Sequence, residues 1–195
     1  MKKKNILTSI LLCHLLFSIS TTAYAQNDTI RSRSVFLEFG GGSNGVGINY
    51  DARFKEDSKW GYRVGFAFGY SKANYFFAAG TSTRVYSIPL EVNYLLGKGK
   101  NRLEMGLGVN TGYYNDHIAV AEHFKFEAEQ WRIAYKNISE NNISSFAYLN
   151  IGYRYTHKRG FQFRIGITPA CMITNNRYCG REALLGLYIS FGKAF

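Results

Sequence analysis

The chain has 195 residues, and 24 lysines and arginines against 13 aspartates and glutamates give it a formal net charge of +11. It holds 20 Gly, 15 Tyr and 15 Phe but only 2 Pro, a composition that suits a membrane β-barrel better than a soluble domain. The basic residues are scattered, which argues against a nucleic-acid partner. No stretch after the first 25 residues holds 18 apolar residues, which excludes transmembrane helices.

The amino-terminal segment has the pattern of a secretory signal. Lys2, Lys3 and Lys4 precede an apolar run over residues 6–19, and Ala23-Tyr24-Ala25 forms a small-x-small cleavage site. We therefore expect residues 1–25 to be a signal peptide for Sec-type export, with residues 26–33 as a short periplasmic leader. Cleavage would lower the net charge to about +8, because the signal carries three lysines and no acid.

After the leader, apolar residues alternate with small or polar ones in eight segments, as in strands with one apolar face. The clearest is 60–70, where Trp60, Tyr62 and Val64 alternate with Gly61, Arg63 and Gly65. We predict strands over residues 34–42, 45–54, 60–70, 84–96, 102–113, 145–155, 161–171 and 186–195. Eight strands of this length make a complete small barrel.

The connections between the strands predict the orientation. Those after the second, fourth and sixth strands are short, as periplasmic turns are, and those after the third, fifth and seventh are longer, as outer loops are. Only the first outer loop, residues 42–45 with the turn dipeptide Asn44-Gly45, is unexpectedly tight. Pro89 and Pro169 predict bulges in the fourth and seventh strands.

The longest interruption, residues 114–144, has two interpretations. Val120, Phe124, Trp131 and Tyr135 approximate a helical stripe. The flanking strands could instead extend into a protruding hairpin with an exposed edge, able to bind a partner by strand addition. The sequence leaves this choice open.

The last ten residues, 186–195, alternate strictly and end on Phe195. They resemble the carboxy-terminal signal of bacterial outer-membrane barrels, which implies recognition by the barrel-assembly machinery.

Residues 45–54 and 88–100 are similar to uncharacterised Bacteroidota members of the OmpA/OmpX-like superfamily of small eight-stranded barrels. The resemblance implies an all-β, antiparallel, up-and-down transmembrane barrel over residues 34–195, in the bacterial outer membrane.

Two sets of side chains follow from the strand pattern. The inward positions carry charges of both signs, which we expect to form a salt-bridge network that fills the narrow interior, since unpaired buried charge is costly. Aromatic residues near the predicted inner interface should form a girdle. The expected network is Glu38, Asp51, Arg53, Arg63, Glu91, Glu104, Arg154 and Arg164; the expected girdle is Trp60, Tyr62, Tyr94, Tyr153, Tyr155 and Phe195.

Catalytic motifs are weak. Gly40-x-Gly42-x-x-Gly45 lacks the helix that a dinucleotide site needs. His117 and His123 lie near Asp116 and Glu122 in the long outer segment, but the sequence places no serine beside them, so we expect solvated histidines. No residue spacing predicts a metal site, and we expect no cofactor.

Cys171 and Cys179 flank the last outer loop. Export favours a disulfide between them, with a free, lipid-facing Cys171 as the alternative.

These observations favour a non-enzymatic envelope-structural or surface-interaction protein, with residues 114–144 as the contact region. We expect a monomer whose partners are outer-membrane lipid and lipopolysaccharide. A lipid-modifying enzyme and a small-solute passage are the alternatives.

Overall fold

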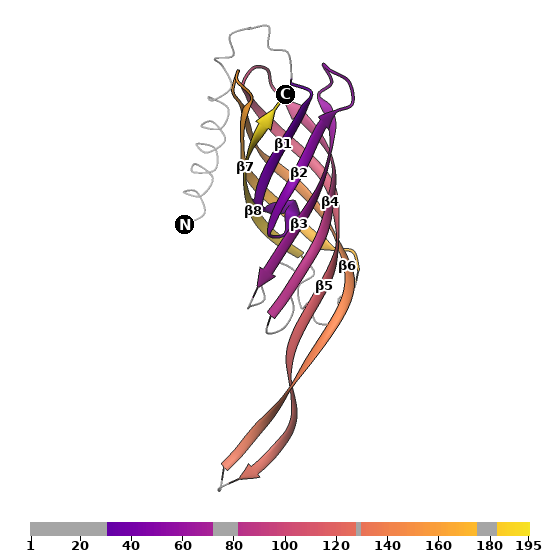
Figure 1. Cartoon of the computed structure of the whole chain (residues 1–195), viewed down its shortest axis with the longest axis vertical. Helices are drawn as coiled ribbons and strands as arrows, with labels where there is room; N and C mark the ends of the chain where they lie inside the picture. Colours follow the sequence, from indigo (N-terminus) through magenta and orange to yellow (C-terminus); the bar gives the residue numbers. More distant parts are fainter. Residues whose placement is uncertain (1–30, 72–81, 128–129, 175–182) are drawn as a thin grey trace, which may run out of the picture.

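The computed structural model describes residues 31–71, 82–127, 130–174 and 183–195. The strands form one closed sheet in chain order, each antiparallel to its neighbours (Figure 1). The predicted eight-stranded up-and-down barrel is confirmed. Among the described residues, no helix is long and apolar enough to span a membrane. The expected signal peptide and most of the leader lie outside the described residues.

The elements follow one another in chain order. They are β1 Arg33–Gly40, the 3-10 turn η1 Gly41–Ser43, β2 Val46–Arg53, β3 Trp60–Ser71, β4 Ser82–Leu96, β5 Asn101–Glu127, β6 Gln130–Thr156, β7 Phe161–Met172 and β8 Ala183–Ala194.

The barrel closes between its first and last strands. The β1–β8 register runs from Ser34 opposite Ala194 to Gly40 opposite Tyr188. The Phe195 N–H donates to the Arg33 carbonyl at 2.9 Å. Closure satisfies the backbone groups that would otherwise form two open sheet edges.

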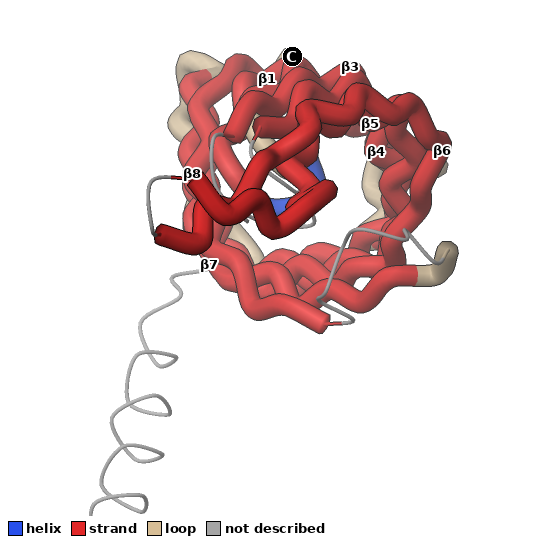
Figure 2. The backbone as a smooth tube through the Cα atoms, turned by 90° about the horizontal axis from the view of Figure 1, so that it is seen from below, coloured by secondary structure: helices blue, strands red, loops and turns tan. Residues whose placement is uncertain are grey.

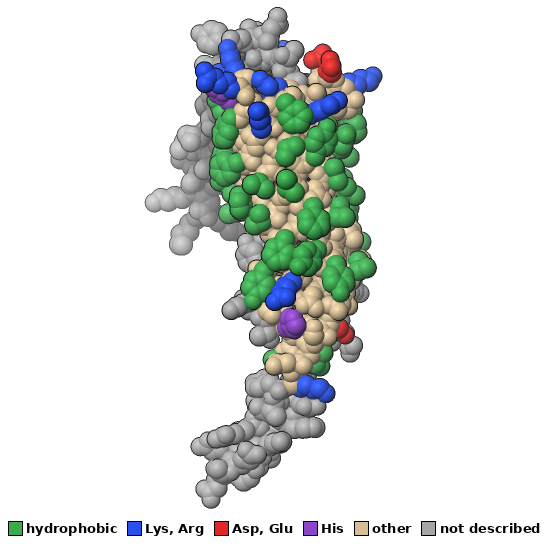
Figure 3. Space-filling view, viewed as in Figure 1, with side chains coloured by type: hydrophobic (Ala, Val, Ile, Leu, Met, Phe, Trp, Pro, Cys, Tyr) green, Lys and Arg blue, Asp and Glu red, His purple; other side chains and the backbone are tan. Residues whose placement is uncertain are grey.

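The two faces of the sheet have opposite character. Residues that alternate outward are apolar and exposed, for example Ile48, Phe66 and Leu107. Apolar side chains cover the face of the barrel seen in Figure 3. Such a continuous apolar surface exceeds what soluble proteins expose, and it suits contact with lipid.

Ala52 is the exception among the residues expected outside, because it is buried. The ring of Tyr62, on the neighbouring strand, lies 6.4 Å from that of Tyr50 and 5.8 Å from that of Phe54. Since these two residues flank Ala52 on the same face, Tyr62 covers it.

The predicted bulges at Pro89 and Pro169 are wrong. The β3–β4 register pairs Val64 with Leu90 and resumes in step at Ala67 with Ser87. A proline donates no N–H, so pairing lapses beside it without an inserted residue. Beside Pro169, the β6–β7 register likewise pairs Tyr148 with Ala170 and resumes in step at Ile151 with Ile167. A register shift occurs instead between Ala121 and His123, in the outer part of β5.

The described residues of 114–144 belong to two long paired strands, the arms of a hairpin. β5 and β6 have 27 residues each, and their register runs from Asn101 opposite Tyr155 to Glu127 opposite Gln130. The pair projects well beyond the barrel at the end away from the carboxy terminus (Figure 1). The helical interpretation of this segment was wrong, and the hairpin alternative is correct.

Candidate functional site

The interior of the barrel is filled by a charged network. All eight side chains that we expected there are buried, and they are joined by ion pairs. Four arginines face four carboxylates, so the set is formally neutral. A balanced network of this kind offsets the cost of removing charges from water.

Asp51 is the centre of the cluster nearer the termini. Its carboxylate accepts from Arg53 Nη2 at 2.8 and 2.9 Å, from the two terminal nitrogens of Arg154 at 3.2 and 3.1 Å, and from Asn93 Nδ2 at 2.6 Å. Arg164 Nη2 lies 3.8 Å from Asp51 Oδ1. Asp51 therefore lies among three guanidinium groups.

Glu104 is the second acid of this cluster. It accepts from Arg154 Nε at 2.8 Å and from Arg164 Nη1 at 3.2 Å. Arg164 also donates to Gln162 Oε1 and to Ser34 Oγ. The cluster thus ties together strands β1, β2, β4, β5, β6 and β7 through side chains alone.

Arg63 organises the second cluster. Its terminal nitrogens lie 2.5 Å from Glu38 Oε1 and 3.4 Å from Glu91 Oε2, and its Nε donates to Asn49 at 3.0 Å. Asn150 donates to Glu91 at 2.6 Å. The buried Phe36 ring separates the two clusters, with Arg164 at 3.8 Å and Arg63 at 5.3 Å from its centroid.

The connection between β1 and β2 folds into the barrel, which the sequence did not predict. We call residues 41–45 the inner turn; Figure 2 shows its 3-10 part inside the ring of strands. Ser43 donates from its N–H and its hydroxyl to Glu38 Oε1, at 3.1 and 2.9 Å. Asn110 Nδ2 donates to the Gly42 carbonyl at 2.6 Å. The turn therefore belongs to the polar network.

Glycines permit this inward path. Gly40 has φ of 76°, and a Cβ there would lie 2.3 Å from the Leu187 carbonyl oxygen. At Gly42 a Cβ would lie 2.6 Å from the ring of Tyr148. Only residues without a side chain fit these positions.

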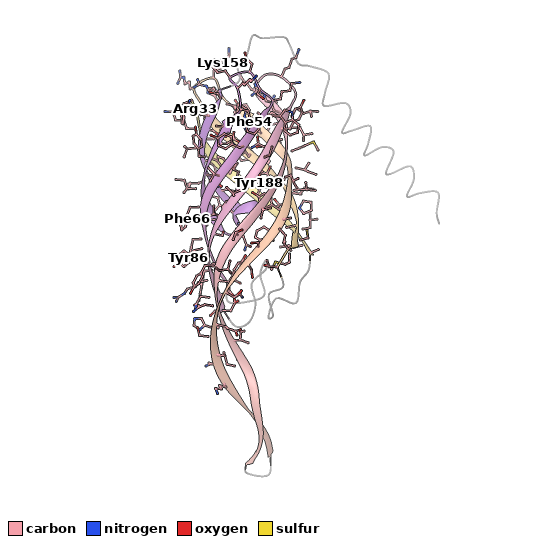
Figure 4. The ribbon with its side chains drawn as sticks, turned by 90° about the vertical axis from the view of Figure 1, so that its right-hand side faces the viewer. Arg33, Phe54, Phe66, Tyr86, Lys158 and Tyr188 are labelled. Atoms are coloured by element: carbon pink, nitrogen blue, oxygen red, sulfur yellow. The ribbon has the colours of Figure 1, made fainter. Side chains whose placement is uncertain are left out.

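Inward aromatic residues complete the seal. Tyr148 and Tyr188 are buried, and both border the inner turn. Figure 4 shows Tyr188 at mid-height in the barrel, at a level between Phe54 and Phe66. Strict alternation in strands 145–155 and 186–195 was the signal that could have identified both rings as lumen residues.

The six expected girdle residues lie near the end of the barrel that carries the short turns. Trp60 and Phe195 are exposed, and the Trp60 ring packs at a tilt against that of Tyr94 across β3 and β4, with ring centroids 4.9 Å apart. Tyr153, also exposed, donates its hydroxyl to Asn101 Oδ1 at 2.6 Å. Tyr155 is half-buried.

The outer parts of β5 and β6 extend beyond the strands on either side of them. β4 pairs with β5 as far as His117, and β7 pairs with β6 as far as Phe146. In the part of the chain that the structure describes, no further strand pairs with β5 or β6 beyond these points, although Ile173 and Thr174 still donate to the Ser145 carbonyl. We call residues 118–127 and 130–144 the hairpin extension.

His117 lies at the base of this extension. It is exposed, and the register places it between Ser82 on β4 and Ser139 on β6. No hydrogen bond joins His117 to either serine in the described chain. Asp116 is buried on the opposite face, where Thr83 donates to it. The side chain of His123 is outside the described set.

Cys171 is exposed on β7 and carries a free thiol. Cys179, its partner in the expected disulfide, lies outside the described residues, so the pairing stays a prediction. Within the described ranges, no group of three or more His, Cys, Asp or Glu side chains could hold a metal ion.

No protein-family model matches the chain, and no curated protein matches it in sequence. Solved structures do resemble it. Neisserial surface protein A aligns with a TM-score of 0.51 and 11% identity, over 84% of this chain and 95% of that one. A major outer membrane protein from Thermus thermophilus aligns with a TM-score of 0.53 and 14% identity, over 84% and 100%. At such low identity these likenesses show a shared barrel fold.

Proposed function

We propose that this chain is an integral outer-membrane barrel with a closed lumen, whose function is to contact partners through the hairpin extension. The membrane assignment is supported by the apolar outer face and by the fold it shares with outer-membrane proteins. We further assign the chain to the OmpA/OmpX-like superfamily, as its residues 45–54 and 88–100 suggest.

The outer edges of the hairpin extension support the functional proposal. Within the described chain, and apart from the interactions that Ala119 and Lys136 already make, each edge lacks the neighbouring strand that a barrel strand would have. An extended peptide segment can add to such an edge as a further strand. The closed, neutral lumen disfavours transport, so the extension is the part of the molecule best suited to a partner.

The other expected properties accompany this proposal. Sec-type export would deliver the chain, its last strand would engage the barrel-assembly machinery, and lipid with lipopolysaccharide would surround the folded monomer. The end that carries the short turns and the carboxy terminus would face the periplasm.

Shortening the extension should abolish binding and spare the barrel. Residues 118–138 are replaced by Asn-Gly, which joins the cross-strand neighbours His117 and Ser139 by a two-residue hairpin turn. Phage-displayed peptides selected on the full-length protein in nanodiscs should bind the shortened protein at least about tenfold more weakly, because the edges are gone. Biolayer interferometry measures the loss.

Backbone methylation of a selected peptide is the matched control. It removes N–H donors without changing side chains, so it should weaken binding to the full-length protein. Peptides that bind the full-length and shortened proteins equally well would contradict the proposal.

A lipid-modifying enzyme is the second candidate, favoured by His117 lying between Ser82 and Ser139. Catalysis of that kind needs the histidine to be oriented by an acid. The neighbouring Asp116 faces the interior and cannot supply this contact. We therefore favour the non-enzymatic assignment.

Replacing His117 separates the two functions. His117→Ala should leave the acyl composition of lipid A unchanged in cells that express the protein, because neither adjacent serine nor Asp116 is arranged to act with it. Mass spectrometry of extracted lipid A, compared with cells lacking the protein, makes the measurement. An acyl change that depends on the protein and disappears in His117→Ala would favour the enzyme.

A further inference from the structure

Cationic side chains gather at the end of the barrel that carries the short turns. On the face seen in Figure 3, lysine and arginine side chains lie at that end, beyond the apolar side chains. They come from the start of β1 and the segment before it, from all three short turns and from β8, so they surround the barrel. We call them the rim cations: Arg31, Arg33, Lys55, Lys59, Lys98, Lys100, Lys158, Arg159 and Lys193.

Among the described residues, few acids lie beside the rim cations. Two acidic side chains, Glu56 and Asp57, share this rim. No rim cation forms an ion pair within the described part of the chain. Arg31 donates instead to the backbone carbonyls of Ala194 and Lys158. Uncompensated like charges repel one another unless an anion binds.

The opposite end is nearly balanced. There, the described parts of β4, β5 and β6 carry four cations, Arg84, Lys125, Arg132 and Lys136, and four acids, Asp116, Glu122, Glu127 and Glu140. The lumen network is neutral as well. The positive excess of the barrel therefore lies almost entirely at the rim.

The rim borders the aromatic girdle. Lys59 precedes Trp60, and Lys193 pairs with Val35 and Phe161 across the sheet. Figure 4 shows Arg33 and Lys158 at this end, near Phe54. Cations at this level place their stems along apolar surface and their charges among lipid headgroups.

We propose that the rim cations bind anionic phospholipid headgroups of the periplasmic leaflet. This inference rests on the membrane assignment made above. Charges that surround the barrel fit a ligand that surrounds it too, which headgroups do. A soluble polyanion would contact one side and leave the remaining cations uncompensated.

Lipid retention tests this inference. The protein is placed in nanodiscs of equal phosphatidylglycerol and phosphatidylcholine, and native mass spectrometry counts the lipids that it retains. We expect phosphatidylglycerol to be enriched about tenfold at low salt and the enrichment to fall at high salt, where charges are screened. Replacing Lys55, Lys59, Lys98 and Lys100 by glutamine should abolish the enrichment.

The matched control changes four cations of the opposite end, Arg84, Lys125, Arg132 and Lys136, to glutamine. It lowers the net charge equally and should keep the enrichment. Equal loss in both variants, or no loss in either, overturns the inference, as does displacement of phosphatidylglycerol by soluble polyphosphate. A heat-dependent gel shift on the same samples shows that the barrel is folded. Its absence would refute the membrane assignment instead.

Discussion

Asp51→Asn should destabilise the barrel more than any other single charge change in the lumen. The substitution leaves Arg53, Arg154 and Arg164 buried around a neutral amide, with Glu104 as the remaining acid of that cluster. Removing one partner of a buried ion pair costs about 3–5 kcal/mol. Urea titration of the protein in detergent, with the folded fraction read from unboiled gels, measures the change in unfolding free energy.

Two further variants make this prediction specific. Asp51→Asn with Arg53→Gln restores the formal charge of the cluster, so it should be more stable than Asp51→Asn alone. Asp57→Asn makes the same chemical change on an exposed turn and should leave the urea midpoint unaltered. If Asp51→Asn and Asp57→Asn behaved alike, the network would not hold the barrel together.

Gly42→Val should disturb the inner turn and weaken the seal of the lumen. The added Cβ would lie 2.6 Å from the Tyr148 ring, which is itself buried. Overpacking of this kind costs about 1–3 kcal/mol. We expect a lower urea midpoint and, in planar bilayers, current steps that are absent from the unaltered protein.

A compensating substitution tests the cause. Tyr148→Leu removes the distal ring atoms, so Gly42→Val with Tyr148→Leu should cost less than the sum of the two single changes. Ala147→Val, which adds two methyl groups on the outer face of β6, should not open the lumen. Steady current through the unaltered protein would favour the solute-passage alternative.

Alternation alone predicted most of the barrel, because each strand there separates lipid from a packed interior. The two faces therefore differ at every second residue: Trp60, Tyr62 and Val64 are apolar or aromatic, whereas Gly61 and Arg63 between them are small or charged. The same rule placed the charged lumen residues, since charges in a narrow barrel face inward.

The hairpin extension could not be predicted in this way. Beyond the lipid both faces of a strand meet water, so the period of two disappears and polar residues such as Asn137, Asn141 and Asn142 occur on either face. A helical stripe then fits such a segment as well as a strand does. The choice between helix and hairpin is decided only by the pairing of β5 with β6, which continues to Glu127 opposite Gln130.

The inner turn was missed for a different reason. Its path depends on contacts that are distant in sequence: Ser43 with Arg63, and Gly42 with Asn110 and Tyr148. Local sequence shows only Asn44-Gly45, which is equally compatible with an ordinary outward turn. The run of glycines over residues 40–42 was the available signal, because such a run permits close backbone packing.

We infer a closed barrel that spans the outer membrane, and heat-modifiability is its sharpest test. Outer-membrane fractions are run on SDS gels with and without boiling. We predict a compact, faster band without boiling and a shift to the full-length position after heating, because closure of β1 on β8 resists detergent until heat unfolds the sheet. A protein found in the soluble periplasm, with no shift on heating, would contradict the claim.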